Sequence, residues 1–470
     1  MGTINSAFSI MSGALDADQA ALNVVANNVA NANTPGYTVE TPDWQQNPPV
    51  IVSGVQNGDG VTETGATSQR DRVLEERLDQ QQQLASASGA RLTALNSVQA
   101  LFTPDSGSSS ATAGDIGSDV TSFFNSFASL EANPTNNALR QNVLSTASTL
   151  AGDLSNDAAS LNAQRAALDQ EAAGVVSQVN SLTGDLAQLN LEIQSTSPHG
   201  DAGTLEDQRQ QDLSQLSQLI GINQVTTENN GLSITTASGQ LLVSEGQSFQ
   251  LTTGTVNGVT NFFLSGANIT SQLAVGGGEL GGYLTARDTD IPSVLGALDQ
   301  IAYGISTQVN TLNNAGTDLA GDNGNAGNIF AQPAQVAGSA VAMSAVMTDP
   351  SHIAAAGLGA GSGDNTNAIA LANLAKQAIA AGQTPTDFYS NFVTSLGSTV
   401  SQVQSENTAQ TASVTQLQTQ NDALSSVNLN DEASSMTALE RSYQAASQVF
   451  TMLNTVMASA LNLGDQTAVS

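Results

Sequence analysis

Few residues in this 470-residue chain are of the types that carry out chemistry. It has no cysteine, which excludes disulfides, thiolate metal sites and cysteine nucleophiles. Two histidines, His199 and His352, leave little material for a catalytic triad or a transition-metal site. His199 lies in the turn-like stretch SPHGD and His352 follows Asp349-Pro350, so we interpret both as surface or capping residues. We predict no cofactor and no metal ion.

Paired carboxylates are the other candidate chemistry, because two acids facing one another in a cleft can hydrolyse a glycosidic bond. The candidate pairs are Glu75-Glu76, Asp169 with Glu171, and Asp431-Glu432. Each pair falls in a predicted amphipathic helix, where acids usually form a solvated face. We therefore predict that the protein is not an enzyme.

Residues 318–325, DLAGDNGN, alternate oxygen-bearing side chains with glycine, as calcium loops do. Their spacing does not match a twelve-residue EF-hand loop, which needs acids at alternate early positions and a final Glu. A polar turn is the preferred interpretation.

The charge balance excludes two large classes of partner. Lys and Arg total 10 against 41 Asp and Glu, a net charge of −31, whereas nucleic-acid binding requires clustered basic residues. The same charge opposes docking on an anionic membrane surface. The first residues lack the basic start and apolar run of a Sec signal peptide, and no stretch is apolar and long enough to span a bilayer. We predict no nucleic acid and no membrane insertion.

Helices with a continuous apolar seam are predicted at both ends of the chain. Apolar residues three and four positions apart indicate helix-to-helix packing, as in coiled coils. The N-terminal seam is Phe8, Met11, Leu15, Leu22, Val25 and Val29. The C-terminal seam is Met436, Leu439, Tyr443, Ala446, Phe450, Leu453, Met457 and Ala460.

The same spacing predicts long helices inside the chain, over residues 74–102, 161–193 and 291–312. Thr384-Pro385-Thr386-Asp387 is a helix start, with a cap, a proline at the first position and an acid in the first turn, and this helix should reach Ser425. Residues 222–270 carry short runs rich in Val, Thr, Ile and Phe, broken by turn dipeptides such as Asn257-Gly258, and predict antiparallel strands.

The predicted fold class is mainly α with a small inserted antiparallel β domain, and the helices form a long bundle or coiled coil in which the N- and C-terminal helices pair. We expect residues 1–69 and 426–470 to form the terminal coiled-coil helices plus an extended segment. Residues 70–221 and 285–425 would be a discontinuous helical body, and 222–284 the β domain. Because one seam does not offset the entropy of ordering about 30 residues, both ends should be mobile in the free monomer and order on assembly.

The N-terminal helix is predicted to end in a block of asparagines followed by a turn. The residues are Asn27, Asn28, Asn31, Asn33, Thr34, Pro35, Gly36 and Tyr37. Proline and glycine stop the helix, and asparagine is unfavourable inside one because its side chain competes for backbone partners. The block is either simple polar capping or a surface where amides are satisfied between repeated identical subunits; the residues alone leave both open.

This stretch, ALNVVANNVANANTPGYTV, resembles the N-terminal signature of flagellar axial proteins, the rod, hook and hook-associated group. The C-terminal stretch SSVNLNDEASSMTALERSYQAASQVFTMLNTVMASALNL resembles the closing helix of the same group. Residues 120–144, 205–222 and 277–288 are similar to the body of the FlgK family of hook-associated proteins.

The resemblance implies a structural protein at the junction of hook and filament, which self-associates in a ring or tube through its terminal helices and is required for filament assembly. Implied partners are the hook protein, the adjacent hook-associated protein on the filament side, and an export chaperone (FlgN) on the C-terminal helix. It also implies an extracellular flagellar location, reached through the flagellar type III apparatus without a cleaved signal peptide. The alternative is another axial protein, a hook or distal rod component, since these share the terminal motifs.

Overall fold

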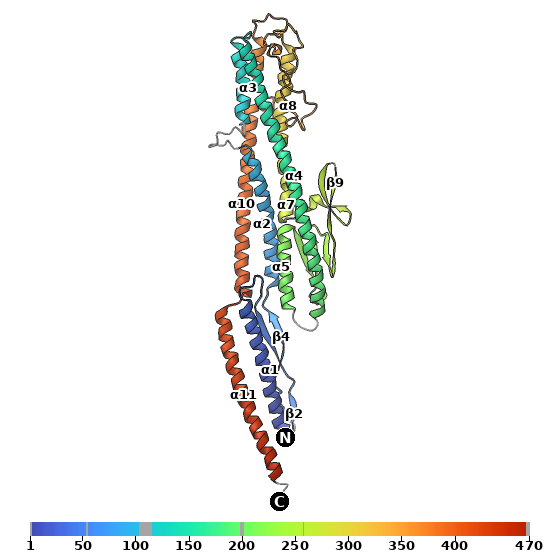
Figure 1. The fold of residues 1–470 in the computed structure, drawn as a ribbon, viewed down its shortest axis with the longest axis vertical. Helices are drawn as coiled ribbons and strands as arrows, with labels where there is room; N and C mark the ends of the chain where they lie inside the picture. The colour runs from blue at the N-terminus through green and yellow to red at the C-terminus, as the bar shows by residue number, and fades with distance from the viewer. Residues whose placement is uncertain (1, 53–54, 103–114, 198–201, 257, 467–470) are drawn as a thin grey trace.

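The structure is a computed structural model that describes residues 2–52, 55–102, 115–197, 202–256 and 258–466. The molecule is a long rod of helices, with both chain ends at one end and irregular loops at the other (Figure 1). A β unit projects from the side of the rod (Figure 1). The mainly helical fold class with small antiparallel sheets is confirmed.

The described α-helices are α1 (Gly2–Asn31), α2 (Arg72–Ala100), α3 (Ile116–Glu131), α4 (Asn137–Thr196), α5 (Gly203–Leu219), α6 (Thr270–Ala274), α7 (Gly278–Thr285), α8 (Ile291–Ala315), α9 (Thr366–Asn373), α10 (Pro385–Ser425) and α11 (Leu429–Gln466). The described strands are β1 (Glu40–Gln46), β2 (Val50–Val52), β3 (Val55–Asn57), β4 (Val61–Ser68), β5 (Ile222–Thr226), β6 (Leu232–Thr236), β7 (Leu241–Ser244), β8 (Gln247–Ser248), β9 (Leu251–Val256), β10 (Val259–Leu264) and β11 (Ala267–Asn268).

Side-chain caps fix where the body helices begin. The carboxylate of Asp71 accepts from the backbone of Val73 at 3.0 Å before α2, and Asn136 accepts from Ala138 at 2.9 Å before α4. Thr384 accepts from the Asp387 backbone at 3.2 Å, so α10 starts at the predicted cap and ends at Ser425, as predicted. Each cap satisfies a backbone donor that the first helical turn leaves unpaired.

The 60-residue helix α4 holds the two halves of the body together. Within the predicted range 161–193, the apolar seam is buried except at the half-buried Leu182; its buried members are Leu161, Leu168, Ala172, Val175, Val179, Leu186, Leu189 and Ile193. The first part of α4 packs with α3, α8 and the loops at the far end, where Phe123 meets Phe127 and Phe330 with ring centroids 5.3 Å apart in both pairs. The second part packs against α5 and the β unit. The single amphipathic helix α4 thereby contributes residues to two hydrophobic cores, one after the other along its length.

The β unit consists of a four-stranded antiparallel sheet in the order β5-β6-β7-β8 and a three-stranded one in the order β11-β10-β9. Gly258, at the predicted turn between β9 and β10, has φ +80°, and Gly239, between β6 and β7, has φ +85°. Asn257 lies outside the described residues. Helix resumes at Thr270 with the short α6, earlier than the Ile291 expected from the sequence. From Gly278 it is continuous, because α7 runs through a π-helical turn at Ala286–Asp290 into α8. The helix α7 packs on α2 and α4.

The segment between α1 and α2 is more regular than the extended segment expected. Strands β1 and β4 pair antiparallel with a bulge between Asp43 and Trp44, and β2 pairs with β3 beyond them. This hairpin lies along α1 (Figure 1). Among the described helices, none combines the length and the hydropathy that crossing a bilayer demands.

Candidate assembly interface at the terminal helices

Helices α1 and α11 lie side by side at the end of the rod (Figure 1), and the rings of Phe8 and Phe450 meet with centroids 4.3 Å apart. Both predicted seams lie largely along this contact. The half-buried seam residues are Phe8, Met11, Leu15, Leu22, Met436, Leu439, Ala446, Phe450, Leu453 and Met457. Val25 is buried, whereas Val29 and Tyr443 are exposed, at 40% and 38%. The side chain of Ala460 lies outside the described residues.

Helix α11 has no buried residue among its described side chains, so in this chain it is packed on one face only. Next to its seam runs a second apolar stripe of Val449, Met452 and Val456, spaced three and four residues apart. These side chains are 42%, 65% and 52% exposed. The only described element with which α11 makes extensive contact is α1. We call these three residues the α11 stripe.

A second face of α1 is more deeply buried than the predicted seam. Ala17, Ala21, Val25 and Asn28 are all below 5% exposed and face the hairpin of β1 and β4. The sequence interpretation missed this face because it followed large apolar residues. The available signal was the pair of alanines four positions apart, which lets a backbone approach closely.

Within the asparagine block, Asn28 is 1% exposed and connects α1 to the following segment by hydrogen bonds. Its amide donates to the carbonyl of Glu40 at 2.8 Å, while its oxygen accepts from the Glu40 backbone at 3.0 Å and from the Tyr37 hydroxyl at 2.8 Å. Burial and the nearby carboxylates raise the pKa of Tyr37, so its hydroxyl remains a donor. Asn28 thus ties the end of α1 to the start of β1.

The other residues of the motif form a local cap. Asn31 donates to the side-chain oxygen of Asn27 at 2.8 Å and accepts from the Thr34 hydroxyl at 3.2 Å. Gly36 has φ +79°, a left-handed conformation that favours glycine. Asn27, Asn33, Thr34, Pro35 and Gly36 are exposed. The two sequence interpretations apply to different residues: Asn27 and Asn31 form a local cap, and Asn33 lies on an exposed polar surface.

The terminal region is joined to the body just beyond this motif. The backbone of Val39 donates to the carbonyl of Ser425, the last residue of α10, at 2.8 Å. The backbone of Thr38 donates to a carboxylate oxygen of Asp207 on α5 at 3.0 Å, and Arg70 contacts the other oxygen of the same carboxylate. Three segments far apart in sequence converge here.

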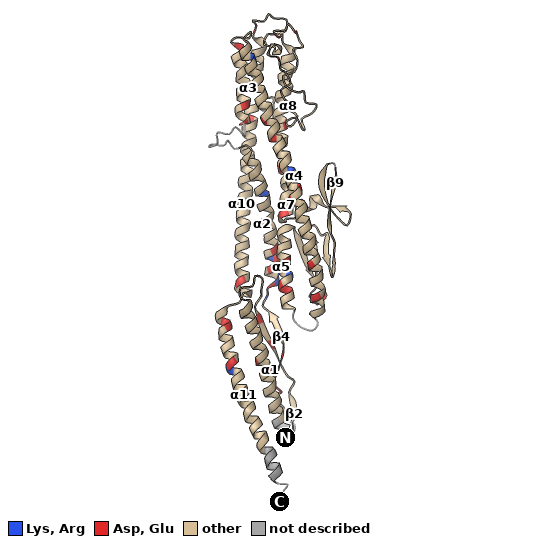
Figure 2. Ribbon diagram, viewed as in Figure 1, with Lys and Arg blue, Asp and Glu red and all other residues tan. Residues whose placement is uncertain are grey.

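A buried cluster of charges surrounds Arg70, and Figure 2 shows acidic and basic residues gathered on α2 and α5 at this level. Arg72 pairs with Glu206 at 2.9 Å, and Arg70 lies 3.7 Å from Glu75. Glu75 is 6% exposed, so the expectation of a solvated face is wrong for this acid. Burial raises the pKa of Glu75 and of Asp207, outweighing the opposite effect of Arg70.

Asp79, one turn further along α2, is the most deeply buried acid of the cluster at 1% exposed. One of its oxygens accepts from Gln210 at 3.0 Å and from Gln224 at 2.9 Å. Its other oxygen has no hydrogen-bond partner among the described residues. Burial raises the pKa of Asp79 to about 7, so its carboxyl changes charge near neutral pH.

Among the remaining candidate acids, Asp169 makes a structural contact, whereas Glu171 is exposed, as expected for a solvated face. Asp169 accepts from the buried Arg287 at 2.6 Å, and Asp431 is exposed at the start of α11. In the polar turn, Asp318 is buried and lies 2.8 Å from His352. The interpretation of His352 as only a surface or capping residue is therefore incomplete. His199 lies outside the described residues.

Known proteins resemble this chain along most of its length. The family model for the flagellar hook-associated protein FlgK helical domain matches residues 105–330, and the one for the flagella basal body rod protein matches residues 9–38. Flagellar hook-associated protein 1 of Bacillus subtilis is 27% identical, with 96% of both chains covered. The proteins of the same name from Escherichia coli and Salmonella typhimurium are also 27% identical, over 73% and 67% of this chain.

The chain covers 64% of the Escherichia coli protein and 57% of the Salmonella typhimurium one. The solved structure of the flagellar hook junction protein FlgK from Burkholderia pseudomallei aligns with a TM-score of 0.65 at 19% identity, covering 75% of this chain and 100% of that one. The rod-type N-terminal motif, the matched helical domain and the shared fold agree. In sequence and in fold, the chain is thus similar to the FlgK family of flagellar hook-associated proteins.

Proposed function

We propose that the chain is a structural junction protein of the bacterial flagellum, which joins hook to filament and is required for filament assembly. It would polymerise through α1 and α11 into a ring or tube. The observation that carries this proposal is the one-sided packing of α11: a half-buried seam against α1 beside the α11 stripe, which no described part of the chain covers. Relatives named as hook-associated proteins support it.

The physical argument rests on the size of the uncovered surface. Burying a large apolar side chain contributes about 1.5–3 kcal/mol, so three stripe residues per subunit contribute several kcal/mol at each repeated contact. The contact would also order helices that are marginal alone. Copies related by a repeated rotation fit this surface, because a head-to-tail contact between identical subunits builds rings and tubes.

The rest of the chain would serve this assembly. Residues 1–69 and 426–470 would form the inner tube, 70–221 with 285–425 the outer body, and 222–284 a lateral β domain. Before export through the flagellar type III apparatus, a chaperone such as FlgN would cover α11, whose exposed stripe otherwise invites early self-association. The hook protein and the next hook-associated protein would contact the two rims of the ring. No catalytic role is assigned.

The test compares the wild-type chain with Val449→Ser/Met452→Ser/Val456→Ser, mixed with isolated hooks and viewed by electron microscopy. The wild-type chain should cap the distal hook end and the stripe variant should not, although circular dichroism shows equal helix content. Gln444→Ser/Gln448→Ser/Asn454→Ser, which changes exposed polar residues of the same helix, is the matched control and should cap normally. Capping by the stripe variant would contradict the proposed contact. Polymers grown without hooks would favour a hook or rod component instead.

A further inference from the structure

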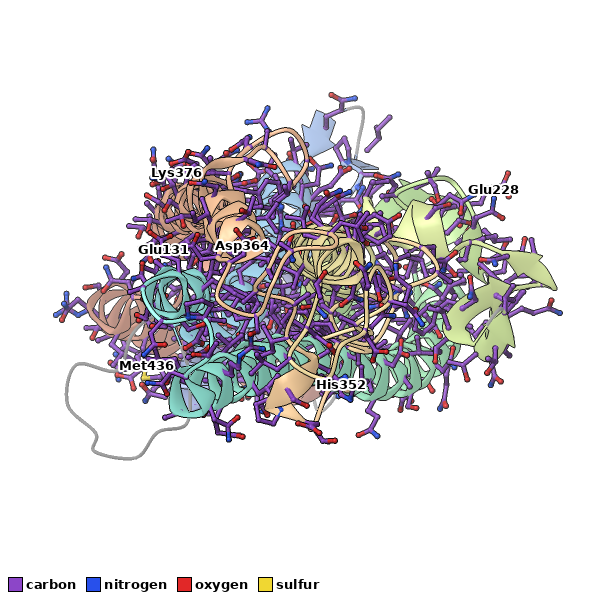
Figure 3. The ribbon with its side chains drawn as sticks, turned by 90° about the horizontal axis from the view of Figure 1, so that it is seen from above. Glu131, Glu228, His352, Asp364, Lys376 and Met436 are labelled. Atoms are coloured by element: carbon purple, nitrogen blue, oxygen red, sulfur yellow. The ribbon has the colours of Figure 1, made fainter. Side chains whose placement is uncertain are left out.

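The loops at the end of the rod away from the chain termini bring three potential metal ligands together. Asp318 and Asp322 lie in the turn after α8, and His352 ends a 3-10 helix (η3) at Pro350–His352. The Nδ1 atom of His352 lies 2.8 Å from Asp318 Oδ2 and 3.5 Å from Asp322 Oδ2. Potential ligand atoms of all three residues lie within 4.8 Å of one another. Figure 3, viewed from above, shows His352 at the edge of the molecule.

Hydrogen bonds that involve no metal hold the Asp318 side chain and the backbones of both loops in place. Asp318 Oδ1 accepts from the backbone of Asp322 at 2.8 Å, which closes the turn. The backbone of Leu319 donates to Ser351 at 3.0 Å, which joins the turn to the 3-10 helix, and the buried Asn313 donates to the carbonyl of His352 at 3.2 Å. The Asp318 carboxylate and the two loops that carry the other ligands are thus positioned before any ion arrives, which lowers the entropic cost of binding one.

The spacing of the ligand atoms suits a small cation. Bonds of 2.0–2.1 Å in a tetrahedral site place neighbouring ligand atoms about 3.3 Å apart, between the two distances that His352 makes here. The side chain of Asp318 is fully buried, whereas those of Asp322 and His352 are 54% and 38% exposed, so an ion could enter from solvent. A fourth position would be left for water.

The local charge also favours a divalent ion. Asp318, Asp322 and the nearby Asp349 carry three negative charges. The positive side chain of Arg140 lies close to them: it donates to the carbonyls of Pro350 and Ile353 and interacts electrostatically with Asp318. A net charge of about −2 remains when the imidazole is neutral, as it is when it binds a metal.

We propose that Asp318, Asp322 and His352 bind one borderline divalent metal ion of the Zn²⁺ class. One imidazole and two carboxylates suit such ions, whereas Ca²⁺ requires six to eight oxygen ligands. Because the ion would bridge two loops at the end of the rod, it would stiffen that end. The site lies apart from the terminal helices, so it does not depend on the role proposed for them.

The experiment titrates the chelator-treated full-length chain with ZnCl₂ in a calorimeter and follows the melting temperature. We expect saturable binding of one ion per chain and a rise in melting temperature. His352→Asn and Asp322→Asn should each weaken binding at least tenfold, a loss expected on removal of a direct ligand. The side chain of Asp322 is exposed, so Asp322→Asn should keep the wild-type melting temperature in chelator. His352→Asn removes the partner of the buried Asp318 carboxylate, so its Zn²⁺-dependent shift is measured from its own melting temperature in chelator.

His199→Asn removes the only other histidine and is the matched control, so its Zn²⁺ affinity should equal that of the wild type. CaCl₂ is the second control and should leave the melting temperature unchanged. The proposal is overturned if Zn²⁺ does not bind saturably, if binding survives both site substitutions, or if His199→Asn abolishes it. Equal stabilisation by Ca²⁺ that His352→Asn does not reduce would also overturn it.

Discussion

Replacing Asp79 by Asn should make the protein more stable at alkaline pH relative to the wild type. The side chain is 1% exposed, and burial raises its pKa from 3.8 to about 7. The folded protein therefore binds a proton that the unfolded chain has already lost between these two pH values, and stability falls as pH rises through this range. Asparagine keeps an oxygen for Gln210 and Gln224 and has no charge to bury.

The magnitude follows from the two pKa values. A difference of about three units corresponds to about 4 kcal/mol of stability lost once Asp79 is fully ionised. Between pH 5 and pH 8 the loss is about 2–3 kcal/mol, because part of it has already occurred by pH 5. The free energy of unfolding of Asp79→Asn minus that of the wild type should increase by this amount across the same interval.

The assay is urea denaturation of both chains at pH 5 and pH 8, followed by circular dichroism. Using the difference between the two chains removes the contributions of other acids whose pKa burial raises, such as Glu75 and Asp207. Asp43→Asn, which makes the same change at an exposed position on β1, is the matched control. If the free energies of unfolding of Asp79→Asn and the wild type differ by the same amount at both pH values, ionisation of the buried Asp79 does not destabilise the protein and the reasoning is wrong.

Three further predictions concern packing and order. Gly282→Ala should lower the melting temperature by several degrees, because the added Cβ would lie 2.3 Å from the carbonyl oxygen of Ala87 and push α7 away from α2. The control is Gly296→Ala, whose Cβ would have no neighbouring atom within 4 Å beyond its own helix backbone and which should be neutral or stabilising. Asn310→Ala should cost about 3–5 kcal/mol, because it leaves the backbone of Ile329 and Phe330 without buried partners; urea denaturation measures this against exposed Thr311→Ala. In a dilute monomer, hydrogen exchange should show residues 5–30 weakly protected, and strong protection there would contradict ordering on assembly.

Much of the fold could be predicted from the sequence because its signals are local. Apolar residues at helical spacing identified α2, α4 and α8, the Thr384-Pro385 cap gave the start of α10, and turn glycines separated the strands of the β unit. The seam of α11 was predicted from spacing alone, and all but one of its described positions are half-buried. The face of α11 that packs on α1 could thus be predicted from the sequence.

The burial and hydrogen bonding of other residues depend on which distant segments pack together, and the local spacing of residues does not predict this. The small-residue face of α1 is buried only because the hairpin of β1 and β4 lies on it, and its alanines look unremarkable in sequence. The role of Asn28 depends on Glu40 folding back to within hydrogen-bond distance.

The sequence by itself determined that this is an acidic, cysteine-free, mainly helical chain with apolar seams at both ends, because composition and periodicity are properties of the chain alone. Only the tertiary structure decided that Glu75 and Asp79 are buried and that His352 meets Asp318. The physical reason is that burial and charge pairing depend on what lies across the contact. A carboxylate on a predicted helix is solvated or desolvated according to the neighbour that covers it, and that neighbour is more than a hundred residues away for Asp79.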